Sequence, residues 1–124
     1  MSHLGRVYTR GMRVAIVRSS YYEDFLARME SSAHAVLRGA GIPEDHIRII
    51  AVPGSFEIPL LCQRLLERKE VDGIIALGVI IQGETFHASE IARACTDGLM
   101  QLQLQYRIPI VHEVLYCKTF EQAQ

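Results

Sequence analysis

One run near the middle of the chain constrains the fold more than any other segment. It reads Ile74-Ile-Ala-Leu-Gly-Val-Ile-Ile81 and has no alternation of polar and apolar residues. A strand with one face in water alternates, so this run is typical of a strand that is covered on both faces. Such a strand needs a layer of helices on each side of its sheet.

Strand and helix patterns alternate along the rest of the chain. Short segments rich in β-branched residues predict strands at 12–18, 47–52, 74–81 and 109–115. Apolar residues at helical spacing predict helices at 22–40, 58–66 and 88–106, and a last helix begins near Thr119. Strands separated by helices imply right-handed crossovers, so we expect an α/β fold: a three-layer α/β/α sandwich around a parallel four-stranded sheet.

Composition narrows the class of protein. The 124 residues carry 13 basic and 14 acidic side chains, and this balance gives no electrostatic reason to bind nucleic acid or an anionic membrane. No apolar stretch approaches the roughly 20 residues that span a bilayer, and the first ten residues lack the apolar segment of a signal peptide. We expect one domain, a cytoplasmic location, and neither nucleic acid nor a membrane as a partner.

The three cysteines do not form a metal-binding pattern. Cys62, Cys95 and Cys117 are far apart and stand among apolar residues, whereas zinc sites favour close pairs. The histidines also lack metal spacing. We expect reduced, buried thiols and no bound metal.

Three loops follow predicted strands and compete for a ligand. They span Ser19–Tyr22, Pro53–Glu57 and Gly83–His87. The carboxyl ends of parallel strands meet at one edge of the sheet, where ligands bind near the switch in strand order. The tyrosines at 21 and 22 and Phe56 offer flat faces for a heteroaromatic ring, although each could instead be a core aromatic.

The third loop has the composition of an anion site. Gly83 allows close approach of the backbone, and Thr85 adds a hydroxyl to the N–H groups that open the next helix. Glu84 opposes an anion unless its carboxylate points away, and an ordinary turn and cap would have the same sequence. His87 could exchange a proton at neutral pH or be a surface histidine. His112, in mid-strand, fits a packing residue or a subunit contact.

Two long motifs carry a resemblance to a known family. They are Val52-Pro-Gly-Ser-Phe-Glu-Ile-Pro59 and Ala76-Leu-Gly-Val-Ile-Ile-Gln-Gly-Glu-Thr-Phe-His87, and Glu121-Gln-Ala123 follows them. With this spacing, the chain resembles 6,7-dimethyl-8-ribityllumazine synthases, enzymes of riboflavin biosynthesis, over about residues 12–124.

The resemblance implies a fold, a reaction and an assembly. The fold would be flavodoxin-like, and the reaction would join 5-amino-6-(D-ribitylamino)uracil to 3,4-dihydroxy-2-butanone 4-phosphate, releasing phosphate and water, without metal or redox cofactor. Family members assemble as homopentamers, some as icosahedral sixty-subunit shells, with active sites between neighbours. Residues 1–11 would be an N-terminal arm that crosses to the next subunit.

The resemblance also implies roles for single residues. Gly83, Glu84 and Thr85 would hold the butanone phosphate through backbone donors, and His87 would transfer protons. Tyr22 would stack on the pyrimidine ring. The segment matching the one that binds the uracil and the ribityl chain contains Ser55, Phe56 and Glu57. Ile80 and Ile81 match a strand end that contacts the uracil through its backbone.

The chain departs from the family pattern at three places. One is after the fourth strand, where Tyr116-Cys117 stands in place of the usual Thr-Thr. His112 and Glu113 replace a Phe-Gly pair that a neighbouring subunit contributes, so one wall of the ring pocket would be polar. The family's C-terminal helix continues after Glu121-Gln-Ala123 and supplies an arginine for the phosphate, whereas this sequence stops at Gln124, which predicts an incomplete C-terminal helix.

Two other classes of function stay open on the sequence. A noncatalytic relative could bind a lumazine or flavin or act as a scaffold, as the departures would permit. The chain could also be an unrelated flavodoxin-like protein that binds a phosphate ligand. In that case the matches to the two long motifs would be a coincidence.

Overall fold

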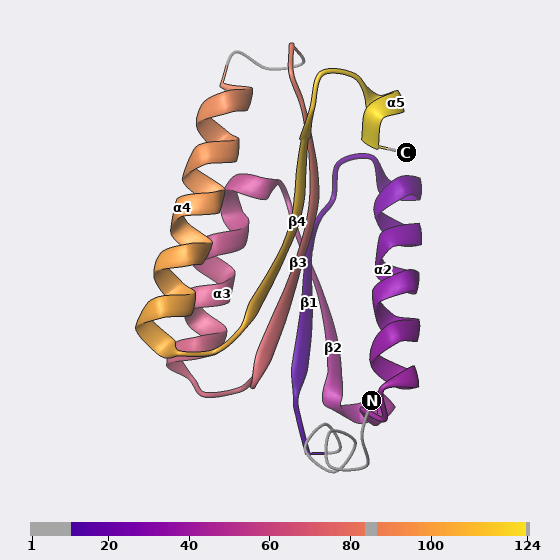
Figure 1. Ribbon diagram of the computed structural model, residues 1–124, viewed down its shortest axis with the longest axis vertical. Coiled ribbons are helices and arrows are strands. Elements are labelled where there is room, and N and C mark those ends of the chain that lie inside the picture. Colours follow the sequence, from indigo (N-terminus) through magenta and orange to yellow (C-terminus); the bar gives the residue numbers. More distant parts are fainter. Residues whose placement is uncertain (1–10, 84–86, 124) are drawn as a thin grey trace.

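A computed structural model describes residues 11–83 and 87–123 (Figure 1). The strands are β1 (Val14–Ser19), β2 (Ile47–Val52), β3 (Gly73–Ile81) and β4 (Ile110–Cys117). The helices are α2 (Glu23–Gly39), α3 (Ile58–Glu67), α4 (Ala88–Tyr106) and α5 (Phe120–Ala123). Every predicted element is present within about two residues of its expected bounds. The N-terminal arm predicted at 1–11 lies outside the described residues except for Gly11.

The four strands form one parallel sheet with the order β2-β1-β3-β4. Helices α3 and α4 cover one face, and α2 and the short α5 lie on the other (Figure 1). This arrangement confirms the predicted three-layer α/β/α sandwich. The strand order is that of flavodoxin-like folds. The order in which the chain adds strands to the sheet reverses between β1 and β3, which is the switch point where ligands bind.

The core lies on both sides of the sheet, and β3 contributes to both parts. Ala76 and Ile80 pack in the cluster under α3 and α4, while Leu77 and Val79 pack in the cluster under α2. The prediction that this strand is covered on both faces is therefore confirmed. On the first side, a β-carbon at Gly98 would meet the Pro59 ring at 3.1 Å, so this glycine allows α4 to approach α3 closely.

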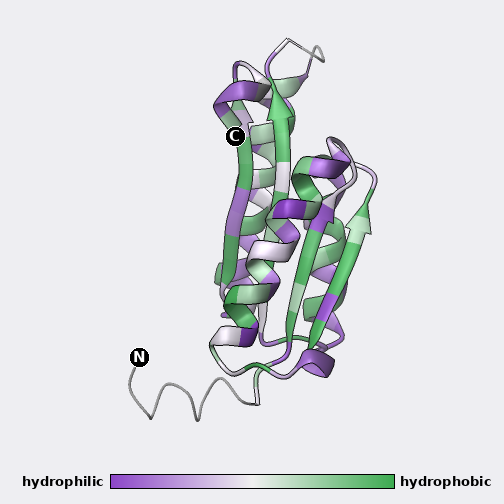
Figure 2. Cartoon of the chain, turned by 90° about the vertical axis from the view of Figure 1, so that its right-hand side faces the viewer, coloured by the Kyte–Doolittle hydropathy of each residue, from purple (hydrophilic) through white to green (hydrophobic). Residues whose placement is uncertain are grey.

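The α2 face of the sheet is only partly covered. Figure 2 views the molecule from this side and shows strands on either side of α2. A groove of about 460 Å³ runs between α2 and strands β3 and β4, and Val36, Ile75 and Val111 help to line it. Helical spacing predicted Val36 on the buried face of α2, but its side chain is 70% exposed. The prediction was wrong because α2 does not cover the whole face, and Val36 lies beside the groove that stays open. Leu26, which the spacing did not single out, is fully buried.

No helix among the described residues is both long and apolar enough to cross a membrane.

Candidate functional site

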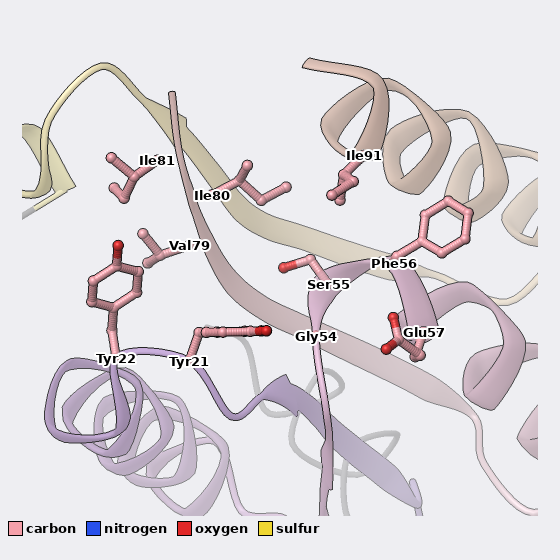
Figure 3. A pocket seen from close by; sticks show the side chains of 10 residues that line it. All are labelled: Tyr21, Tyr22, Gly54, Ser55, Phe56, Glu57, Val79, Ile80, Ile81 and Ile91. Carbon is pink, nitrogen blue, oxygen red and sulfur yellow. The ribbon is translucent and has the colours of Figure 1, made fainter. Parts of the chain in front are cut away.

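A pocket of about 290 Å³ opens at the carboxyl ends of the strands, at the switch between β1 and β3 (Figure 3). It is formed by residues from the loops after β1 and β2, the end of β3 and the start of α4. The residues that line it are Tyr21, Tyr22, Gly54, Ser55, Phe56, Glu57, Val79, Ile80, Ile81 and Ile91.

The pocket exists because β3 continues past the end of its neighbour. Pairing between β1 and β3 ends at Arg18 and Leu77, whereas pairing between β3 and β4 continues to Ile81 and Cys117. Within the described part of the chain, no strand pairs with residues 78–81 on the β1 side. Backbone groups on that edge of β3 therefore face the pocket and can bind a ligand.

A short loop after β1 brings two tyrosines to this edge. The Ser20 hydroxyl donates a hydrogen bond to the Val52 carbonyl at 2.8 Å and so ties this loop to the end of β2. Tyr22 follows with a left-handed backbone (φ 56°, ψ 56°), which is strained for a non-glycine residue, and it begins α2. The sequence left open which tyrosine faces the ligand; both line the pocket.

A buried arginine anchors the helix that begins at Tyr22. Arg18 is only 6% exposed, and its guanidinium pairs with the carboxylates of Glu23 and Glu30, the latter at 2.9 Å. Hydrogen bonding to Glu23 raises the pKa of Arg18 from its ordinary value, against the opposing effect of burial. This network fixes the first turns of α2 to β1, next to Tyr22.

The loop after β2 contains a 3-10 turn over Ser55–Glu57 that was not predicted. The Glu57 N–H donates to the Gly54 carbonyl at 3.2 Å and closes the turn. Ser55 is 6% exposed, and its hydroxyl is directed into the pocket (Figure 3). The carboxylate of Glu57 also lies at the pocket, next to Gly54.

The remaining walls are apolar. Phe56 lies on the α4 side of the pocket, opposite the tyrosines, and is 62% exposed (Figure 3). Ile80 and Ile81 contribute opposite faces of β3, and each packs into a different core cluster. Gly54, Val79 and Ile91 were not singled out as site residues from the sequence. Gly54 lies within the predicted ligand loop Pro53–Glu57, and Ile91 follows His87 by one helical turn, so both had a signal that could have indicated them.

The predicted phosphate loop is described only in part. Gly83 has φ +91°, in the region that favours glycine, and this backbone is compatible both with the predicted anion loop and with an ordinary turn. The predicted residues Glu84 and Thr85 lie outside the described residues. His87 precedes α4, and its Nδ1 lies 3.2 Å from the Glu90 carboxylate, which orients the ring. Neither Gly83 nor His87 lines the pocket.

His112 is held on β4, away from this pocket. Its Nδ1 accepts a hydrogen bond from the Val114 N–H at 3.1 Å, and its Nε2 lies 2.9 Å from the Thr96 hydroxyl. Since a backbone N–H can only donate, the ring carries its proton on Nε2 and donates it to Thr96. Within one chain, then, the structure does not bring His112 to the predicted ring site.

Two of the three thiols are unsuited to nucleophilic chemistry at neutral pH. Burial raises the pKa of Cys62 to about 12 and that of Cys95 to about 11. Cys117, the last residue of β4, is only partly buried, in contrast to the expectation for all three. Among the described residues, no group of three or more His, Cys, Asp or Glu side chains could hold a metal ion.

Comparison with known proteins gives one family. The family model for 6,7-dimethyl-8-ribityllumazine synthase matches residues 11–124. A protein of that name from Levilactobacillus brevis is 38% identical over 120 residues, which are 97% of this chain and 76% of that protein. Another, from Halorhodospira halophila, is 39% identical over 111 residues, or 90% of this chain and 71% of that protein. The chain therefore belongs to the 6,7-dimethyl-8-ribityllumazine synthase family.

Proposed function

We propose that this chain condenses 5-amino-6-(D-ribitylamino)uracil with 3,4-dihydroxy-2-butanone 4-phosphate to 6,7-dimethyl-8-ribityllumazine, releasing phosphate and water. One observation carries the proposal: six residues that the family motifs assign to the uracil substrate converge on a single pocket at the β1/β3 switch. They are Tyr22, Ser55, Phe56, Glu57, Ile80 and Ile81.

The pyrimidine ring lies against Tyr22 in this proposal. The ring of Tyr22 packs beside the α2-side core, and Val79 and Ile81 line the pocket next to it. A flat apolar wall of this kind gains by stacking on a heteroaromatic ring. The backbone of β3 beyond Leu77 supplies hydrogen bonds to the polar edge of the uracil.

Ser55 and Glu57 bind the polar groups of the same substrate. A hydroxyl can donate and accept, whereas a carboxylate only accepts, so the two sites suit different substrate groups. Because both come from one closed 3-10 turn, their spacing is set before the ligand binds. Preorganisation of this kind lowers the entropy lost on binding.

The butanone phosphate occupies the loop before α4. Gly83, Glu84 and Thr85 bind it mainly through backbone N–H groups, and a helix N-terminus adds a favourable dipole. The left-handed backbone of Gly83 and the helix start at Ala88 support this assignment. The reaction requires the ketone carbon of this substrate to lie within reach of the uracil amine.

His87 moves the protons. Imine formation requires a proton to leave the attacking amine and another to reach the departing oxygen, and phosphate loss and ring closure need further transfers. A histidine can carry out each of these at neutral pH. Orientation of two reactants in one pocket supplies much of the remaining acceleration. No step needs a covalent nucleophile, in keeping with the raised thiol pKa values of Cys62 and Cys95.

We also propose that the protein works in the cytoplasm as a homo-oligomer, a pentamer or larger. In that assembly, β4 of one subunit borders the pocket of its neighbour, and His112 and Glu113 form a polar wall there. The exposed side chains of Val111 and Tyr116 on the same strand support an interface. Native mass measurement tests this point, since a stable monomer would contradict it.

The reaction itself is tested by the His87→Ala variant. Purified protein is mixed with both substrates, and lumazine formation is followed by absorbance. We expect the rate to fall about 10²- to 10⁴-fold when an acid–base residue is lost, with the assembly unchanged. A variant as fast as the wild type would remove His87 from the mechanism.

A further inference from the structure

We propose that Tyr21 is a specificity-determining residue of this site. Together with Glu57, it recognises the hydroxyl groups of a polyol chain, here the ribityl chain of the uracil substrate. The inference rests on the proposed function and adds a residue to it that the family motifs do not assign.

The geometry places the Tyr21 phenol and the Glu57 carboxylate on either side of one bare α-carbon. A β-carbon at Gly54 would lie 3.4 Å from Cε2 of Tyr21 and 3.7 and 3.8 Å from the two carboxylate oxygens of Glu57. Figure 3 shows the Tyr21 ring edge-on, with its hydroxyl directed toward Gly54 and Glu57. The absent side chain thus leaves a polar corner in an otherwise apolar pocket.

Both sides of this corner are held by the backbone. The Ser20–Val52 hydrogen bond fixes the residue before Tyr21, and the left-handed turn at Tyr22 fixes the residue after it. The Glu57 N–H donates a hydrogen bond to the Gly54 carbonyl, so the backbone that carries the Glu57 carboxylate is fixed in a closed turn. The corner is therefore built before any ligand arrives.

The chemistry of the corner matches a polyol better than a planar ring. Each hydroxyl of a sugar alcohol both donates and accepts, and a phenol with a carboxylate offers both functions, whereas two carboxylates would only accept. Among the described residues the Tyr21 hydroxyl has no hydrogen-bond partner, and the side chain is 66% exposed. In the proposed function the planar uracil ring binds at another part of the pocket, against Tyr22, Val79 and Ile81.

Binding of two unreactive probes tests the assignment. Both are uracils without the 5-amino group: 6-(D-ribitylamino)uracil carries the polyol, and 6-(methylamino)uracil does not. Titration calorimetry gives the Kd of each for the wild type and for Tyr21→Phe, which keeps the ring and removes the hydroxyl. Tyr106→Phe is the matched control, because Tyr106 ends α4 and does not line the pocket.

We expect Tyr21→Phe to weaken binding of the ribityl probe about 3- to 10-fold, the equivalent of one lost hydrogen bond, and to leave the methylamino probe unchanged. Tyr106→Phe should change neither Kd. Equal losses for both probes, or no loss for either, would overturn the role of Tyr21 while the proposed function stands. If the wild type binds neither probe, both the role and the proposed function are overturned.

Discussion

The Ser55 hydroxyl oxygen lies only 2.6 Å from the position that a β-carbon on Gly78 would occupy. The 3-10 turn after β2 therefore packs directly against the backbone of β3 at Gly78, the glycine that interrupts the apolar run. This contact joins two family motifs that are far apart in sequence. It explains why Ser55 can be buried at the floor of the site.

Gly78→Ala should consequently destabilise the fold. The added methyl group would meet the Ser55 oxygen and, at 3.3 Å, the side chain of Val114, so we expect a loss of about 1 to 3 kcal/mol in the free energy of unfolding. Chemical denaturation measures it. Ser55→Ala in the same chain removes the first clash and should restore part of the loss.

Gly39→Ala is the control for that change. A β-carbon at Gly39, the last residue of α2, meets nothing within 4 Å. Alanine there should leave the stability unchanged or raise it by up to about 1 kcal/mol, because it restricts the unfolded chain. If Gly78→Ala were as stable as Gly39→Ala, the close contact with Ser55 would be wrong.

Replacement of Arg18 by methionine should lower stability through the lost ion pairs with Glu23 and Glu30. Methionine keeps most of the volume but leaves both carboxylates without their cation. We expect a loss of about 1 to 3 kcal/mol, below the value for a fully buried pair because water can reach both carboxylates. Arg48→Met, which breaks an exposed pair with Glu70, should cost less than about 1 kcal/mol. Equal losses in the two variants would show that burial of Arg18 adds nothing.

Thiol titration should separate Cys117 from the other two cysteines. The pKa values of about 12 for Cys62 and about 11 for Cys95 leave almost no thiolate at pH 8, and both side chains are buried. A disulfide reagent added to the native protein should therefore react quickly with one thiol, that of Cys117. After unfolding, it should react with all three thiols. Cys117→Ser should abolish the fast phase; a fast phase that survives this change would contradict the burial of the other two.

The sheet and its helices could be predicted because their signals are local. The unbroken apolar run at 74–81 requires cover on both faces, and the spacing of Cys95, Leu99 and Leu102 gives the buried side of α4. The same spacing puts Ile91 on the apolar side of α4 but does not indicate that it lines a pocket.

The shape of the site could not be predicted because it depends on distant contacts. The 3-10 turn at Ser55 has no periodic pattern and lies against Gly78, which follows it by more than twenty residues. The left-handed backbone of Tyr22 likewise has no sequence signal, since an aromatic residue rarely adopts it. The exposure of Val36 depends on which part of the sheet one helix can cover.

The most direct test of the central claim fills the pocket and measures the reaction. Gly54 has an extended backbone (φ −147°, ψ 174°) that any residue can adopt, so Gly54→Leu projects a side chain between Tyr21 and Glu57 without backbone strain. The initial rate of lumazine formation from both substrates is compared with the uncatalysed rate. We predict clear acceleration by the wild type and by Gly39→Ala, and a rate near the uncatalysed one for folded Gly54→Leu. A folded wild type without acceleration, or a Gly54→Leu variant with the wild-type rate, would contradict the assignment of this pocket.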